Sequence, residues 1–216
     1  SSNHDLFPKL IPMVLQDITL TETEDVKGLL FLLRCVPLLY NVNKTKKTCQ
    51  KILLWLGKII KRLDERIPQD QTDKNLIIAK ALVLEITSLL ICSDSTNTLF
   101  AKELVEKMTP SAQSFLFQNP TSVWTMRGTF YFLKAANSVN LPNDLFASVD
   151  QVFDALSPNL RQCNHYLRLY TLCVLDSLPK KQFVVNHADI DFTGDLDEEP
   201  SSSLSKPGSV VFSGSC

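Results

Sequence analysis

Apolar residues recur at intervals of three and four along most of the chain, and short polar breaks separate the apolar segments. This spacing predicts amphipathic helices, because residues three or four apart share one helix face. With their capping residues, the expected helices cover 5–18, 24–40, 44–66, 72–92, 99–108, 119–137, 142–156 and 163–178. Thr109 and Pro110 are expected to interrupt the fifth helix, which leaves a further helical turn up to residue 117.

The succession of helices predicts a repeat architecture. Eight helices joined by short polar breaks pair into four antiparallel hairpins, and the repeat length of roughly 40 residues is that of HEAT-type repeats. The chain has only 6 glycines in 216 residues, so it offers few tight turns and few loops that could hold a phosphate. We therefore predict an all-α fold, an α-solenoid of about four HEAT-like helical hairpins over residues 1–179, which presents a long surface to partners.

Residues 180–216 differ in character from the helical part. Six acidic residues follow one another without a basic residue between them: Asp189, Asp191, Asp195, Asp197, Glu198 and Glu199. Serines, a proline and a glycine come next. Such a composition buries too little apolar surface to fold by itself, so we expect an acidic, Ser-rich, disordered C-terminal tail or linker.

Charge, hydropathy and cysteine usage narrow the function classes. A formal net charge of −1 argues against a binder that relies wholly on electrostatic attraction to nucleic acid. The apolar stretch 29–40 is much shorter than the roughly 20 residues of a membrane span, so we expect no membrane partner. None of the six cysteines forms a C-x-x-C pair. Free thiols in apolar helices fit a reducing compartment.

No motif in the sequence indicates catalysis. There is no G-x-S-x-G, P-loop or G-x-G-x-x-G pattern, and no nucleophile has a recognisable base near it. Cys163 and His165 lack further ligands at a fixed spacing, and a histidine at a helix start is the simpler interpretation. The aromatic residues of 124–132 are expected in the core. We therefore expect no enzyme, no catalytic residue, no cofactor, no metal site and no small-molecule substrate.

The third expected helix, residues 44–66, carries the most distinctive surface pattern. Its lysines and arginines are opposed only by Asp64 and Glu65. At about 100° per residue, several of these side chains and one tryptophan fall within an arc of about 100°. They are Lys44, Lys47, Lys51, Trp55, Lys58, Arg62 and Arg66. The adjoining arc is apolar, which predicts a buried face beside a basic stripe.

Two interpretations of this stripe remain open. The basic side chains could contact RNA phosphates or an acidic partner segment, with Trp55 available for stacking. Alternatively, the stripe is a solvated lysine face whose tryptophan packs against a neighbouring repeat, as charged faces of helical repeats often do.

One segment resembles a known family. Residues 156–178 read LSPNLRQCNHYLRLYTLCVLDSL, in which a polar break precedes a Leu-Arg-Leu helix. This is similar to the repeats of the U3 small nucleolar RNA-associated protein 20 family, also called the down-regulated-in-metastasis family, of HEAT-repeat proteins of the small-subunit processome. The matching positions are Arg168, Leu169, Thr171, Leu172 and Leu175.

The resemblance implies a function as well as a fold. It implies a non-catalytic scaffold in a nucleolar pre-ribosomal assembly that supports pre-rRNA processing. Its partners would be other proteins of a large assembly and RNA at the third helix, in the nucleus and nucleolus. The alternative is an armadillo/HEAT-type adaptor in transport or signalling, which binds a peptide in a helical groove and could be cytoplasmic.

Overall fold

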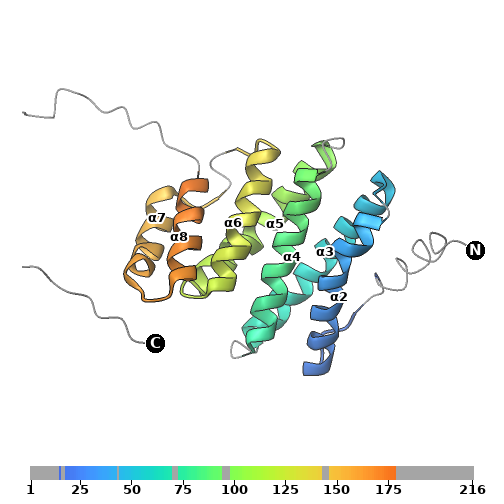
Figure 1. Cartoon of the computed structure of the whole chain (residues 1–216), viewed down its shortest axis with the longest axis horizontal. Helices are drawn as coiled ribbons and strands as arrows, with labels where there is room; N and C mark the ends of the chain where they lie inside the picture. Colours follow the sequence, from blue (N-terminus) through green and yellow to red (C-terminus); the bar gives the residue numbers. More distant parts are fainter. Residues whose placement is uncertain are drawn as a thin grey trace, which may run out of the picture. The chain divides into compact units, whose positions relative to one another are not determined.

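The computed structural model describes residues 15, 18–42, 44–69, 73–93, 98–142 and 146–178 of the chain. Over these residues the fold is all-α, with seven α-helices, two short 3-10 helices and no strand (Figure 1). The expected all-α class is thereby confirmed. The expected first helix, apart from residues 15 and 18, and the expected acidic tail lie outside the described residues.

The helices follow the apolar segments of the sequence closely. Their bounds are α2 Thr23–Val42, α3 Lys46–Arg66, α4 Lys74–Ser93, α5 Thr98–Gln118, α6 Val123–Ser138, α7 Val149–Leu156 and α8 His165–Ser177. The 3-10 helices η2 Ile67–Gln69 and η3 Ser157–Arg161 follow α3 and α7. Each 3-10 helix contains a proline, Pro68 or Pro158, and proline disfavours α-helical geometry in the residue before it.

Four of the helices begin at a polar capping residue. The side-chain oxygens of Thr45, Ser122, Ser148 and Asn164 each accept a hydrogen bond from the backbone N–H three residues later, at 3.1–3.3 Å. At Ser148 the bond is reciprocated, because the Gln151 side chain accepts from the Ser148 backbone N–H. These bonds satisfy N–H groups that lack a partner within the helix, and so they fix where α3, α6, α7 and α8 start.

Two expected helix boundaries are wrong. The fifth helix is not interrupted at Thr109 and Pro110, because α5 continues through both to Gln118. Buried Val105, Met108, Ala112 and Phe115 lie on both sides of the proline, and their burial outweighs the lost hydrogen bond. The seventh helix begins at Val149 rather than near residue 142, where the capping box sets its start.

The helices pack in an alternating pattern along the chain. The most extensive contacts join α4 to α6, α6 to α8 and α2 to α4, so these four helices form a row. Consecutive helices also pack on each other, α3 on α4, α5 on α6 and α7 on α8, while α3 and α5 contact each other beside the row (Figure 1). Within the row, α4 and α6 approach closely at Gly128 of α6, where a Cβ atom would lie only 2.8 Å from Cα of Ala81 in α4.

Helix α4 is the most apolar helix of the described part of the chain. It is long and apolar enough to cross a membrane, with a mean hydropathy of 2.1 over its most apolar window, and 67% of that window is buried inside the protein. The expectation based on residues 29–40 overlooked this segment. Neighbours on several sides account for the composition, because α2, α3 and α6 all pack against α4 and leave it little polar surface.

Candidate interaction surfaces on α3

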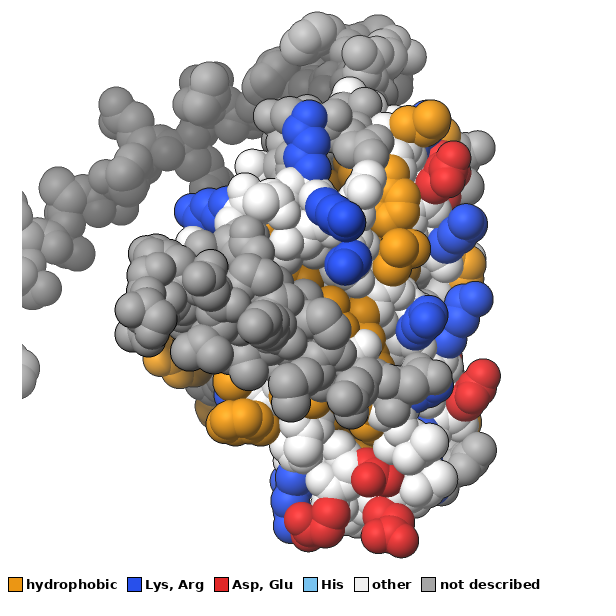
Figure 2. Space-filling model, turned by 90° about the vertical axis from the view of Figure 1, so that its right-hand side faces the viewer, with side chains coloured by type: hydrophobic (Ala, Val, Ile, Leu, Met, Phe, Trp, Pro, Cys, Tyr) orange, Lys and Arg blue, Asp and Glu red, His pale blue; other side chains and the backbone are white. Residues whose placement is uncertain are grey.

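The exposed part of the predicted basic stripe is narrower than the sequence suggested. Lys44, Lys47, Lys51 and Lys58 are exposed, and we call these four side chains the basic face. Figure 2 looks at the side of the molecule that carries α2 and α3. It shows lysine and arginine side chains gathered on this side, with most of the acidic side chains in the view toward the bottom. The basic face therefore presents several positive charges to solvent close together.

The two arginines of the stripe, Arg62 and Arg66, are less exposed than its lysines. Both are half-buried. The guanidinium of Arg62 donates a hydrogen bond through Nη1 to the backbone carbonyl of Ile18, the residue that leads toward α2. The Nε of Arg66 is buried and has no hydrogen-bond partner among the described residues. Arg62 therefore ties α3 to the segment before α2, and neither arginine is as exposed as the four lysines of the basic face.

Trp55 lies in the core. Only 5% of this residue is exposed, and it belongs to the cluster of buried apolar residues that α2–α6 share. The expectation that its ring is available for stacking is therefore wrong, because the ring packs within the apolar core. The other part of the alternative interpretation, a lysine face that is only solvated, stays a prediction. The position of Trp55 at the edge of the stripe explains the result, since the next residues around the helix, Thr48 and Ile59, are buried as well.

A polar cluster that sequence reasoning missed joins α3, α4 and α5. The Lys80 ammonium of α4 lies 2.5 Å from Oδ1 of Asp64 in α3, and the hydroxyl of Ser111 in α5 donates to the same oxygen at 2.8 Å. Lys80 is 3% exposed, and burial lowers the pKa of its ammonium below the ordinary 10.5 even though Asp64 acts in the opposite direction. The sequence did contain a sign of this cluster, namely a lysine within an apolar helix. A lysine that is buried with such a helix needs a partner of opposite charge.

A second buried ion pair joins α4 to α6. Arg127 donates from Nε to Oε2 of Glu85 at 2.9 Å and from Nη2 to Oε1 at 2.6 Å, a bidentate arrangement. The hydrogen-bonded carboxylate of Glu85 raises the pKa of the Arg127 guanidinium. The two buried charged residues of α4, Lys80 and Glu85, are thus both paired within the fold, whereas Lys74 at its start is exposed.

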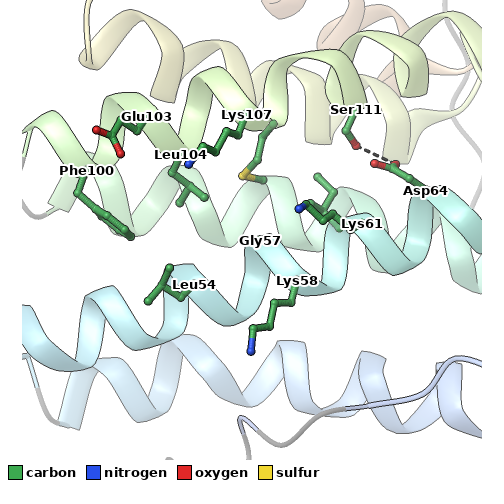
Figure 3. Close-up of a pocket in the computed structure, with 12 residues that line it drawn as sticks. Leu54, Gly57, Lys58, Lys61, Asp64, Phe100, Glu103, Leu104, Lys107 and Ser111 are labelled. Carbon is green, nitrogen blue, oxygen red and sulfur yellow. Dashed lines mark hydrogen bonds between the residues drawn. The ribbon is translucent and has the colours of Figure 1, made fainter.

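A groove between α3 and α5 lies on another side of α3. We call it the α3–α5 groove. Its apolar lining consists of Leu54, Ile60, Phe100, Leu104 and Met108, and its volume is about 250 Å³. Figure 3 shows the two helices with the groove between them. Gly57 faces it, and a Cβ atom there would lie 3.3 Å from Cδ1 of Leu104, so the absent side chain leaves room.

Charged side chains surround the α3–α5 groove. Lys61 and Lys107 come from α3 and α5 respectively, and Lys58 also lines the groove but directs its ammonium away from α5 (Figure 3). All three are exposed, and none forms an ion pair within the described residues. Of the two acids that line the groove, Asp64 already accepts from Lys80 and Ser111, which leaves Glu103. The edge of the groove is therefore positive.

The candidate metal residues lie apart from other ligands. Cys163 and His165 are exposed, and Asn164 between them caps α8 through its side chain. Within the described ranges, no three His, Cys, Asp or Glu side chains gather as they would around a metal ion. The five cysteines of the described part, Cys35, Cys49, Cys92, Cys163 and Cys173, form no disulfide with one another.

The residues that carry the family resemblance lie on different sides of α8. Thr171 is buried and accepts a hydrogen bond from Asn159 Nδ2 at 3.3 Å, whereas Leu169 and Leu172 are 44% and 55% exposed. Arg168 donates to the carbonyl of Gln162 at 2.5 Å. Comparison of the chain with protein-family models, with curated proteins and with solved structures found no match.

Proposed function

We propose that this chain is a non-catalytic scaffold of the α-solenoid type, built from HEAT-like helical hairpins. The support is the packing pattern, in which consecutive helices pair and every second helix from α2 to α8 contacts the next one in a row. In a repeat architecture each unit contacts mainly its neighbours, and the stacked units offer an extended surface to partners. The four caps and the small share of glycine fit a chain made of regular helices.

The proposed partner of the basic face is RNA in a nucleolar pre-ribosomal assembly. The observation that carries this proposal is a set of four exposed lysines, none of which forms an ion pair in the described part of the chain. Lys47, Lys51 and Lys58 lie on one side of α3, and Lys44 comes just before the helix. Lysines in this arrangement contact phosphates without reading the base sequence. The nucleolar setting rests on the resemblance of residues 156–178 alone.

Replacing three lysines tests the basic face. Lys44, Lys47 and Lys51 are the suitable positions, because Lys58 also borders the α3–α5 groove. Their change to glutamine should leave the free energy of unfolding nearly unchanged, since exposed charges contribute little to it. Affinity for a labelled single-stranded RNA should fall, and the dependence of log K on log salt should become shallower by about 0.7 for each lost phosphate contact.

A matched control variant loses three positive charges at positions outside the basic face. Lys27, Lys74 and Lys134 are exposed on α2, α4 and α6, and their replacement by glutamine should leave RNA affinity close to that of the wild type. If both triple variants bind RNA equally, only net charge matters, and the basic face is merely solvated. Recovery of precursor ribosomal RNA and nucleolar proteins with the tagged chain from nuclear extract tests the setting.

The alternative function, a peptide-binding adaptor, is supported by a different observation. Such an adaptor needs an apolar groove with a charged edge, and the α3–α5 groove has both. Recovery of karyopherins or kinases in place of nucleolar proteins would favour the adaptor over the RNA-binding scaffold.

A further inference from the structure

The size of the α3–α5 groove limits what it can hold. A cavity of about 150 Å³ accepts a benzene molecule, and sites for drug-sized ligands usually have 300–1,000 Å³. At about 250 Å³ the groove is suited to one large apolar side chain, aromatic or aliphatic, and is small for a cofactor. Its open side and its position between two helices are those of a peptide-binding groove.

Covering the apolar lining of the groove with a ligand would lower the free energy. Leu104 and Met108 are buried and form part of it, but Leu54 at its edge is 53% exposed. Figure 3 shows Leu54 and Phe100 approaching each other from α3 and α5 at one end of the groove. Covering apolar surface of this kind contributes about 25 cal/mol per Å². An inserted side chain would therefore be held mainly by burial.

The charges around the groove select the residues beside that side chain. Lys58, Lys61 and Lys107 are exposed and unpaired in the described part of the chain, and Glu103 is the acid that remains opposite them. Asp64 does not offset these lysines, because Lys80 and Ser111 already occupy its Oδ1. Lysines at the edge of an interface attract carboxylates and repel basic segments.

We propose that the α3–α5 groove binds a short acidic segment of a partner protein, with one bulky apolar side chain in the groove and carboxylates on Lys61 and Lys107. This site is separate from the proposed RNA contact on the basic face, although Lys58 of the basic face also lines the groove. The chain would then hold an RNA and an acidic peptide on two sides of one helix.

The direct test fills the groove with a side chain of the protein itself. In Gly57→Leu the new side chain would occupy the space that the peptide needs, and the nearest atom, Cδ1 of Leu104, is the end of a flexible side chain that can move aside. The probe is a short fluorescein-labelled peptide of Asp and Glu with one central Phe, and its binding is followed by fluorescence anisotropy. Gly57→Leu should weaken binding at least about tenfold, as the loss of a central contact does.

A second variant tests the same proposal without a substitution that could disturb the fold. Lys61→Glu with Lys107→Glu changes only exposed side chains, so the fold is retained. It should weaken binding of the acidic peptide by about tenfold or more, and it should now bind a peptide in which lysines replace the acids around the same Phe. Changing the Phe of the acidic peptide to Ser should weaken its binding to the wild type.

The outcomes separate this site from the basic face. The variant with Lys44, Lys47 and Lys51 changed to glutamine should keep peptide binding, and Gly57→Leu should keep RNA binding. The groove proposal is overturned if the wild type does not bind the acidic peptide, if Gly57→Leu binds it as well as the wild type, or if the Phe-to-Ser peptide binds equally. Loss of RNA binding alone in the lysine variant leaves the groove proposal standing.

Discussion

Gly128 offers the sharpest test of how α4 and α6 pack. Replacing glycine by alanine inside a helix normally stabilises a protein by about 1 kcal/mol, because glycine has the greater backbone freedom in the unfolded chain. At Gly128 the added Cβ would lie 2.8 Å from Cα and 3.2 Å from Cβ of Ala81. The shortest contact is to backbone, which cannot rotate away, so the two helices would have to separate.

The expected magnitude follows from the balance of these two effects. Overpacking a well-packed core destabilises by about 1–3 kcal/mol, and the row of helices has its most extensive contact at this interface. After the gain in helix propensity of about 1 kcal/mol, Gly128→Ala should lower the free energy of unfolding by up to about 2 kcal/mol. Gly28→Ala is the matched control, because its Cβ would meet no atom within 4 Å. It should raise that free energy by about 0.5–1 kcal/mol.

Urea unfolding followed by far-ultraviolet circular dichroism measures both variants against the wild type. The slopes with urea should stay equal, so that a shift in midpoint reports stability. Adding Ala81→Gly to Gly128→Ala should restore little, since the 2.8 Å contact to Cα remains. If Gly128→Ala is as stable as Gly28→Ala, α4 and α6 do not approach as closely as described, and the reasoning fails.

Three further predictions concern the two ion pairs of α4 and the cap of α7. Because the pKa of Lys80 is lowered in the folded state, the unfolded chain binds more protons than the folded chain between that pKa and 10.5. The free energy of unfolding of the wild type should therefore rise with pH in this window, relative to that of Lys80→Met. Urea unfolding at a series of pH values from neutral to 10.5 measures this difference, and a fall with pH would refute the predicted sign. Arg127→Lys loses the bidentate bond to Glu85 and should destabilise by about 1 kcal/mol in urea unfolding, whereas Arg127→Lys in a Glu85→Gln background should lose less. Ser148→Ala removes the cap of α7 and should destabilise by about 1 kcal/mol, with no change expected for Ser148→Asp; thermal unfolding measures both.

The helices were predictable where burial and local chemistry agree. The apolar period alone places α3 within two residues at its start and correctly at its end, and Pro68 comes two residues after that end. At Pro110 burial and local chemistry disagree, because the proline favours a break while apolar residues on both sides favour one helix. In the structure, tertiary packing decides this conflict in favour of one continuous helix. The proline by itself does not show which of the two effects is stronger.

The surfaces of α3 were predictable only in part. Spacing placed the lysines of the basic face correctly on one side of the helix. It could not show that Trp55 is buried, since a residue at the edge of an apolar arc is covered or not according to the neighbouring helices. The α3–α5 groove could not be predicted from the sequence. Gly57 and Leu104 become neighbours only when α3 and α5, which are separated by α4 in the chain, pack against each other.

The two ion pairs of α4 determine which way this helix faces. A helix that is apolar on nearly all sides could be turned about its axis or moved along it with little change in buried apolar area, so burial alone would allow several placements of similar energy. Lys80 and Glu85 lie about 140° apart around the helix. They meet Asp64 of α3 and Arg127 of α6 together in a single orientation. Any other placement would leave a charge buried without a partner, which is strongly unfavourable. The least hydrophobic residues of α4 thus make its place in the fold unique.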